Sequence, residues 1–168
     1  MSCRIFIAFL CLFTATVLAQ SEESQLQNEA PNFELENLDG DWIILNDNLG
    51  KGPVLISFWA TWCKPCMEEL SHIQKIFEKY KEKGLMVYAI STDNEKSVAK
   101  VKPLIKSSNY SFPVLLDTGG ETARNYFARQ VPYSVILDEN GKIVYSNTGY
   151  KKGDELNVEE IIKSLIEK

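Results

Sequence analysis

Val54-Leu-Ile-Ser-Phe-Trp-Ala-Thr-Trp-Cys-Lys-Pro-Cys66 is the most informative part of the sequence, because an uninterrupted apolar run leads there directly into a Cys-x-x-Cys pair. Residues 54–60 have the length and the continuous hydrophobicity of a strand that is covered on both faces. From Lys64 onward, apolar side chains recur every three or four residues, which predicts an amphipathic helix of about five turns over residues 64–83. The two cysteines therefore stand where a buried strand ends and a long helix begins.

Strands and helices alternate on both sides of this junction. The expected elements are a hairpin over residues 33–45 around Asp39-Gly40, a strand over 85–90, a weak helix over 95–107 that Pro103 kinks or ends early, a strand over 114–116, a short helix over 121–128, a hairpin over 133–145 with an Asn140-Gly141 turn, and a last helix capped by Asn157. This order predicts an α/β fold with a mixed central sheet, helices on both faces and an N-terminal β-hairpin.

Composition narrows the class of protein. The chain has 168 residues, of which 45% are hydrophobic and 24% charged, and this balance excludes a disordered or low-complexity protein. With 18 basic and 23 acidic side chains the net charge is −5, which argues against nucleic acid or acidic lipids as partners. One globular domain is expected.

The first residues have the layout of a signal peptide. A short positive start ending at Arg4 precedes an apolar run over residues 5–18, and Ala19 suits cleavage before Gln20. The run is shorter than the ~20 residues of a spanning helix, although an uncleaved anchor on the cell envelope is an alternative. We expect a signal peptide over 1–19, a disordered spacer over 20–30, a domain over 31–168, and export to the periplasm or cell envelope.

After cleavage the chain keeps only two cysteines, Cys63 and Cys66, in a compartment where disulfides are allowed. A helix N-terminus stabilises a thiolate, so Cys63 at the start of the helix is expected to face solvent and attack a partner disulfide. Cys66 lies one turn in, is shielded, and displaces the partner to leave the pair oxidised. The pattern predicts a redox site.

Other uses of the pair fit the sequence less well. A structural disulfide gains little from closing so short a loop. A zinc site needs two further ligands, and the mature chain offers only His72, to which we assign no role. A c-type haem site needs a histidine after the second cysteine, where Met67 stands. No metal and no cofactor are expected.

Several motifs in order resemble the thioredoxin superfamily, and within it the exported thiol–disulfide oxidoreductases of the TlpA/ResA kind, which have an AhpC/TSA-redoxin-like domain. The resemblance runs from about Ala30 to the C-terminus. The motifs are Ala30-Pro-Asn-Phe33, Trp59-Ala-Thr-Trp-Cys-Lys-Pro-Cys66, Glu69, Phe112-Pro-Val-Leu-Leu-Asp117, Val131-Pro132 and the tail containing Gly149. The resemblance implies a thioredoxin-like fold.

The resemblance also implies how a client protein is held. Pro132 would be a cis-proline opposite Cys63, and the backbone of Val131 would pair with an extended client peptide beside the sulfur. Trp62 is expected to be an exposed aromatic on the docking surface, whereas Trp59 is expected in the core.

Two positions depart from the relatives. Ser57 occupies the place where cytoplasmic thioredoxins carry a buried acid, so Glu69 is the candidate to exchange a proton with Cys66; the alternative is a solvated helix carboxylate. Ser71 stands where relatives have a proline, which predicts a straighter helix.

The leading function is a thiol–disulfide oxidoreductase that reduces disulfides of exported clients, for example in cytochrome c maturation, with electrons from a membrane thiol donor. One alternative is a thiol peroxidase of the peroxiredoxin type, although Ala60 occupies the place where such a site needs threonine. Another is a redox-inert client-binding domain. The sequence does not state the direction of electron flow.

Overall fold

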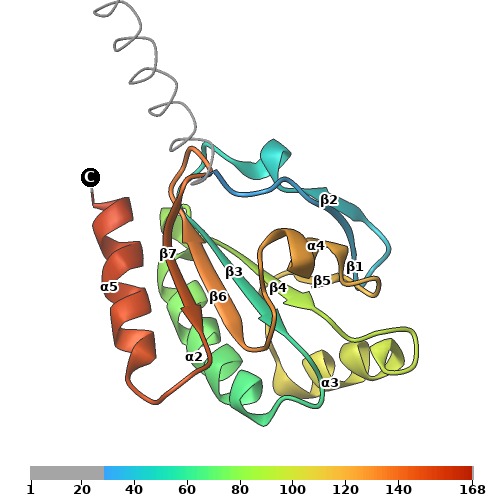
Figure 1. Cartoon of the computed structure of the whole chain (residues 1–168). Helices are drawn as coiled ribbons and strands as arrows, with labels where there is room; N and C mark the ends of the chain where they lie inside the picture. Colours follow the sequence, from blue (N-terminus) through green and yellow to red (C-terminus); the bar gives the residue numbers. More distant parts are fainter. Residues whose placement is uncertain (1–28, 168) are drawn as a thin grey trace, which may run out of the picture.

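A single sheet of seven strands, in the order β2-β1-β5-β4-β3-β6-β7, forms the centre of the molecule (Figure 1). The computed structural model describes residues 29–167; the predicted signal peptide and residues 20–28 of the predicted spacer lie outside them. The strands are β1 (Glu34–Asn37), β2 (Trp42–Ile44), β3 (Val54–Trp59), β4 (Met86–Ser91), β5 (Val114–Leu116), β6 (Tyr133–Leu137) and β7 (Ile143–Thr148). The helices are α2 (Lys64–Tyr80), α3 (Val101–Ser108), α4 (Glu121–Asn125) and α5 (Asp154–Ile166), with the short 3-10 helices η1 (Asn46–Asn48), η2 (Lys81–Lys83) and η3 (Val98–Lys100).

Strand β3 lies at the centre of the fold, and all six of its residues are buried. It pairs in parallel with β4 and antiparallel with β6, while β6 forms the predicted closing hairpin with β7. At the other edge, β1 pairs antiparallel with β2 and with β5. The α/β class, the mixed sheet and the N-terminal hairpin are therefore confirmed.

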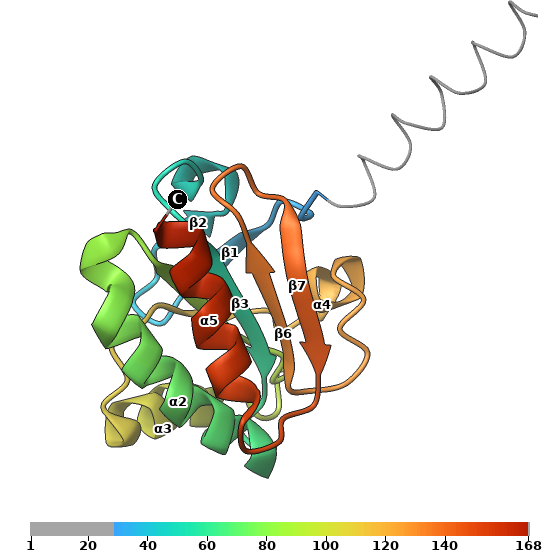
Figure 2. The ribbon, with the colours of Figure 1, turned by 90° about the vertical axis from the view of Figure 1, so that its left-hand side faces the viewer.

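Helices cover the two faces of the sheet unequally. The apolar sides of α2, α3 and α5 share one core with side chains of β3, β4 and β6. The short helix α4 and the N-terminal hairpin cover the opposite face and enclose a second core. Figure 2 shows α5 and α2 on one side of the sheet and α4 on the other.

Several helix boundaries differ from those expected. The helix expected over residues 64–83 ends at Tyr80 and is followed by η2, and the helix expected over 95–107 begins at Val101, after η3. Pro103 neither kinks nor ends α3, because it stands in the first turn, where its missing N–H has no intrahelical partner to lose. Helix α4 ends at Asn125 rather than 128. Asn157 is not a cap, since α5 already begins at Asp154, whose Oδ2 accepts the N–H of Lys151 at 2.8 Å. Helix α2 continues without interruption through Ser71.

The described chain begins on the sheet edge. Glu29 bridges to Lys142, and the N–H of Ala30 donates to the C=O of Gly141 at 2.9 Å. These two residues were expected in the disordered spacer, but they are bound to the β6–β7 hairpin at the residues just before β7. Within residues 29–167, no helix has the length and hydrophobicity to span a bilayer.

Candidate active site

The two cysteines lie at the start of α2 and form a disulfide, with a Cα–Cα distance of 5.3 Å. Cys63 is the N-cap residue, and its Sγ accepts the backbone N–H of Cys66 at 3.3 Å. Pro65 occupies the first turn, where a helix tolerates it. The sulfur of Cys63 therefore sits among the unpaired N–H groups of a helix N-terminus, an environment that stabilises negative charge.

Cys63 is more covered than expected. Its residue surface is 5% exposed, whereas that of Cys66 is 0% exposed. The expectation that Cys63 faces solvent is wrong for the disulfide form, because the N-cap geometry turns its Sγ back over the first helical turn. The prediction that Cys63 is the more accessible of the two cysteines is confirmed, since only Cys63 has any exposed surface.

Trp62 and Pro132, which the resemblance places around Cys63, have the exposure and the peptide-bond conformation expected of them. Trp62 is 70% exposed, as expected, and Trp59 is fully buried. The Val131–Pro132 peptide bond is cis, as the resemblance implies. The C=O of Pro132 accepts the N–H of Gly149 at 2.8 Å, on the β7 side.

Val131 stands two residues before β6, whose first residue, Tyr133, pairs with Phe58 near the end of β3. The hydrogen bonds found among residues 29–167 use neither the N–H nor the C=O of Val131. A donor and an acceptor are therefore free beside the end of β3.

Glu69 is buried rather than solvated, with 8% of its surface exposed. Ser57 donates its hydroxyl to Oε2 at 2.9 Å, and Ser134 donates to Oε1 at 2.8 Å. Ser57 and Ser134 are direct partners across β3 and β6. The alternative of an exposed helix carboxylate is therefore wrong, and the acid lies against the serine that replaces the buried acid of cytoplasmic thioredoxins.

The environment changes the acidity of Glu69. Burial removes water from the carboxylate and raises its pKa to about 7, although the hydrogen bonds from Ser134 and Ser57 act in the opposite direction. The negative charge of Asp154 on α5 raises the pKa further. Glu69 thus changes charge near neutral pH.

This shift predicts how stability depends on pH. The folded chain holds the Glu69 proton between about pH 4.5 and 7, whereas the unfolded chain has released it, so stability from this group is full below pH 4.5 and is lost as pH rises through 7. Glu69→Gln removes this loss. Between pH 4.5 and 8, the free energy of unfolding of Glu69→Gln should therefore gain about 3 kcal/mol relative to wild type.

Urea unfolding of the oxidised proteins at both pH values measures this difference. Glu68→Gln is the control, because Glu68 is the exposed neighbour on the same helix and loses the same charge. A constant difference between Glu69→Gln and wild type across the pH range would contradict the burial of an ionisable carboxylate.

Asp93 is a second buried carboxylate near the cysteines, which the sequence analysis missed. It accepts the N–H of Thr61 at 2.7 Å and the hydroxyl of Thr61 at 2.7 Å. Burial alone would raise the pKa of Asp93, but hydrogen bonds, including those from Ser97 and Thr61, lower it below its usual range. Asp93 therefore ties the loop before Cys63 to the end of β4.

Ser134 was also missed. Both residues had a signal in the sequence, since Ser134 is a polar residue inside the apolar run 133–137 and Asp93 stands two residues after a buried strand. Neither residue could be linked to the cysteines without the register of the strands.

A narrow pocket connects Glu69 with the surface. It lies between α2, α5 and the β6–β7 hairpin, has a volume of about 10 Å³, and is bounded by Glu69, Ser134, His72 and Tyr150, among others. This is about the space of one water molecule. The Nδ1 of His72 lies 3.9 Å from Oε1 of Glu155 at the rim.

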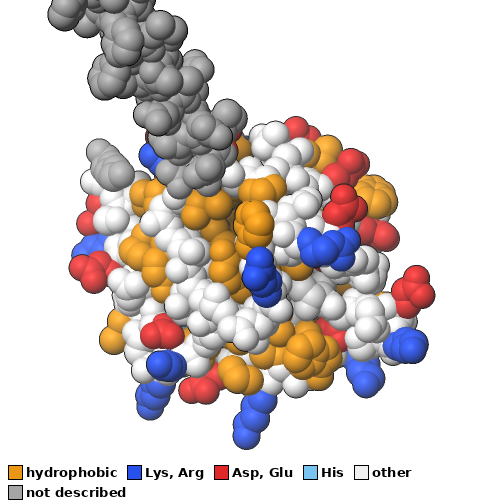
Figure 3. Space-filling model, viewed as in Figure 1, with side chains coloured by type: hydrophobic (Ala, Val, Ile, Leu, Met, Phe, Trp, Pro, Cys, Tyr) orange, Lys and Arg blue, Asp and Glu red, His pale blue; other side chains and the backbone are white. Residues whose placement is uncertain are grey.

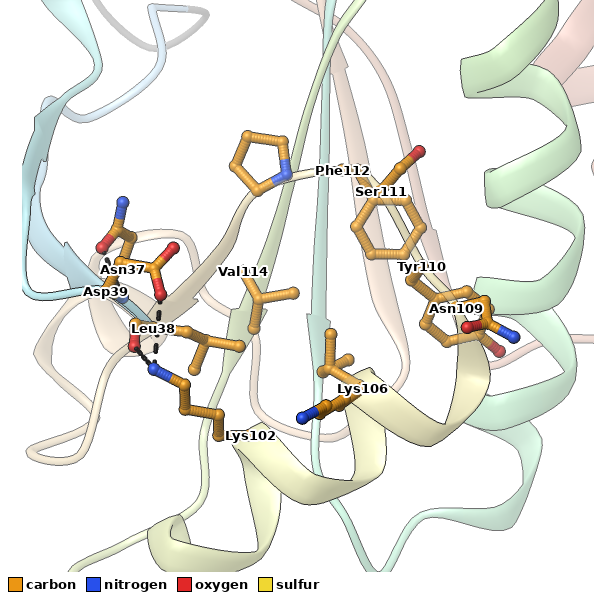
Figure 4. Close-up of a pocket in the computed structure, with 12 residues that line it drawn as sticks. Asn37, Leu38, Asp39, Lys102, Lys106, Asn109, Tyr110, Ser111, Phe112 and Val114 are labelled. Carbon is orange, nitrogen blue, oxygen red and sulfur yellow. Dashed lines mark hydrogen bonds and ion pairs between the residues drawn. The ribbon is translucent and has the colours of Figure 1, made fainter.

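A larger pocket, of about 610 Å³, lies elsewhere, between α3 and the β1–β2 turn (Figure 4). Lys102 reaches across its edge and donates to the C=O of Leu38 at 2.6 Å and to Asp39 at 3.3 Å. Neither cysteine lines it, and neither do Glu69 or Val131. We therefore place it outside the redox site.

Comparisons with known proteins agree with this geometry. The AhpC/TSA family profile matches residues 26–146. The thiol-disulfide oxidoreductase ResA of Bacillus cereus is 37% identical over 147 residues, which cover 88% of this chain and 82% of that protein. A putative thiol:disulfide interchange protein DsbE from Chlorobium tepidum has a similar structure, with a TM-score of 0.76, 29% identity and coverage of 83% of this chain and 96% of that one. An uncharacterized thioredoxin-like protein from Porphyromonas gingivalis gives a TM-score of 0.70 at 36% identity, with coverage of 83% and 94%.

Proposed function

Because the chain belongs to the AhpC/TSA family, has a thioredoxin-like fold and is a thiol–disulfide oxidoreductase, we propose that it reduces disulfides of exported proteins through Cys63 and Cys66. The observation that carries this proposal is the cysteine pair at the N-terminus of α2, beside the free backbone groups of Val131. A redox-inert binding domain does not fit a chain with this pair and with these relatives.

The reaction begins with the reduced pair. The thiolate of Cys63 attacks one sulfur of a client disulfide, a mixed disulfide forms, and the other client sulfur leaves and takes up a proton. Cys66 then loses its proton and attacks the sulfur of Cys63, which releases the second client thiol. Two electrons pass to the client, and the Cys63–Cys66 disulfide forms.

The client is held as an extended chain. The N–H and C=O of Val131 supply one donor and one acceptor for its backbone, as an added strand would use them. Pro132 fixes Val131 beside the end of β3, and the exposed ring of Trp62 supplies apolar contact on the same loop as Cys63. Backbone pairing accepts many client sequences, because every residue has the same backbone groups.

Glu69 holds the proton that leaves Cys66. It lies one helical turn beyond Cys66, and its pKa of about 7 allows it to be either charged or protonated at neutral pH. When it is ionised, its charge disfavours a second thiolate on Cys66 in the resting reduced pair. The pocket at its side provides room for a water molecule that exchanges the proton with solvent.

The direction of electron flow is proposed from the relatives, which are named thiol-disulfide oxidoreductases. A thiolate of Cys63 stabilised at the helix N-terminus would by itself make the pair more oxidising, so the reduction potential is the quantity that tests this direction. The N-terminal pattern supports export to the periplasm or cell envelope, where a membrane thiol donor would restore the reduced pair and haem-attachment cysteines of cytochrome c would be among the clients.

We expect the Cys63–Cys66 couple to have a reduction potential below about −200 mV, toward the reducing end of the range of such pairs. The purified protein is equilibrated with dithiothreitol or glutathione buffers, and the oxidised fraction is measured from the mass shift after thiol alkylation. A potential near −120 mV would identify an oxidant and contradict the proposed direction of electron flow.

A peroxidase can be separated from a disulfide reductase with the same protein. We expect wild type to reduce a protein disulfide catalytically and to consume hydrogen peroxide only slowly. Peroxide consumption that survives in Cys66→Ser would favour the peroxidase instead.

A further inference from the structure

Phe127 combines two features that do not favour folding. Its ring is 75% exposed, the highest value among the large hydrophobic residues that the structure describes as exposed. Its φ is +56°, in the left-handed region that residues with bulky side chains rarely adopt. Both features occur at one position, which suggests that the ring makes a contact outside the fold.

The backbone at this corner requires the left-handed conformation. The N–H of Ala128 donates to the C=O of Ala123 at 2.8 Å, and the N–H of Phe127 donates to the C=O of Arg124 at 3.0 Å. This pattern is a Schellman motif that ends α4, and Phe127 occupies the position where glycine is usual. Glycine would therefore satisfy the backbone better than phenylalanine does.

The neighbouring tyrosine supplies the packing at this corner. The ring of Tyr126 lies 5.4 Å from that of Phe58, and its hydroxyl donates to the C=O of Pro31 at 2.7 Å. Tyr126 is buried, whereas Phe127 points away from the core. The exposed ring is thus not needed to hold α4 on the sheet.

The segment that carries Phe127 leads to the client-binding backbone. It runs from α4 to the start of β6 on the face of the sheet opposite α2 and α5 (Figures 1 and 2). Figure 3 shows hydrophobic side chains gathered on this face over β6, β7 and that segment. Val131, Tyr133 and Ile143 are half-buried there, so the apolar surface continues from the active-site end of the sheet.

The chain length limits how far Phe127 lies from Val131. Phe127 stands four positions before Val131, so the two Cα atoms are at most about 14 Å apart. An extended client chain, rising about 3.3 Å per residue, covers this distance with four or five residues. A client that pairs with Val131 can therefore reach Phe127.

We propose that Phe127 is a second docking contact for the client, which binds a bulky apolar side chain four or five residues from the client's reactive cysteine. This inference rests on the proposed function, because it takes the occupant to be the polypeptide that Cys63 attacks. The partner chemistry is an extended segment with an apolar residue, since the ring offers an exposed apolar face and no charge. With Trp62 beside Cys63, the two exposed rings would contact the client at two points along its length.

The test compares Phe127→Gly with wild type on three probes. Two are eleven-residue peptides whose central cysteine is joined to glutathione, with either leucine or serine at the fourth and fifth positions on both sides. The third is hydroxyethyl disulfide, which is too small to reach Phe127. We expect Phe127→Gly to lower kcat/KM for the leucine peptide about tenfold through KM, to abolish the preference for leucine over serine, and to leave hydroxyethyl disulfide within twofold.

Stability separates docking from a structural role. Because glycine suits the left-handed position, Phe127→Gly should melt about 2 °C above wild type while its use of the leucine peptide falls. Phe127→Tyr should retain the leucine preference. The control is Trp42→Ala, which removes a 63% exposed ring from β2 at the far edge of the sheet and should change neither peptide.

Three outcomes would overturn the inference. The first is that Phe127→Gly lowers kcat/KM equally for the leucine peptide and for hydroxyethyl disulfide, and the second is that it keeps the preference for leucine. The third is a wild-type dimer in sedimentation that dissociates in Phe127→Gly, which would assign the ring to a contact with a second copy of the chain. If wild type reduces none of the three probes, the proposed function itself fails.

Discussion

Replacing Cys66 by serine is expected to leave the protein covalently joined to its clients through Cys63. The attacking thiolate remains at the N-terminus of α2, but the thiol that resolves the mixed disulfide is gone. Catalytic turnover should fall to background, while stable adducts accumulate. Cys66 is fully buried in the oxidised pair, next to the sulfur of Cys63 that it attacks during resolution.

The adducts can be counted directly. Cell-envelope proteins are mixed with the purified Cys66→Ser protein, free thiols are alkylated, and adducts that a reductant releases are identified by mass spectrometry. Cys63→Ser is the matched control and should form none, because Cys66 lacks exposed surface. Similar amounts of adduct from both variants would contradict the assigned roles. Clients with paired cysteines and export signals would support the proposed location.

Replacing Glu69 by glutamine should slow the release of clients about 100-fold at pH 8, which is the lower end of the usual effect of a general base. The carboxylate can take the Cys66 proton only when it is ionised. With a pKa of about 7, the wild-type rate of resolution should therefore rise as pH increases through 7 and level off above it. Glu69→Gln should give a low rate without this step.

Single-turnover kinetics from pH 5 to 9 separates the two chemical steps. The attack by Cys63 should differ little between wild type and Glu69→Gln, whereas resolution should differ strongly. Glu68→Gln, which loses the same charge at an exposed position, should follow wild type. Ser134→Ala provides a further check, because loss of that hydrogen bond should move the midpoint of the wild-type step to higher pH. Superimposable profiles for wild type and Glu69→Gln would remove the proton-transfer role.

Local patterns in the sequence were enough to predict the order of strands and helices and the position of the redox pair. The apolar run of β3 and the three-to-four-residue period of α2 are local signals, so the junction that holds Cys63 and Cys66 could be predicted without any distant contact. The exposure of Trp62, expected together with the family resemblance, agrees with its place in the short loop between these two elements. The start of the last helix was predicted wrongly, because Asn157 has the sequence spacing of an N-cap but lies inside a helix that begins at Asp154.

The contacts that surround this junction depend on the tertiary structure and could not be predicted from local patterns. Glu69 meets Ser134 across 65 residues of chain, and Thr61 meets Asp93 across 32. Both contacts depend on the register of β3 with its neighbours β6 and β4, which is fixed by the packing of whole strands between two cores. Burial of Glu69, and with it a pKa near neutrality, follows from that register. The candidates Cys63, Cys66 and Glu69 could therefore be named from the sequence, whereas the pairing of distant strands set the environment that raises the pKa of Glu69 to about 7.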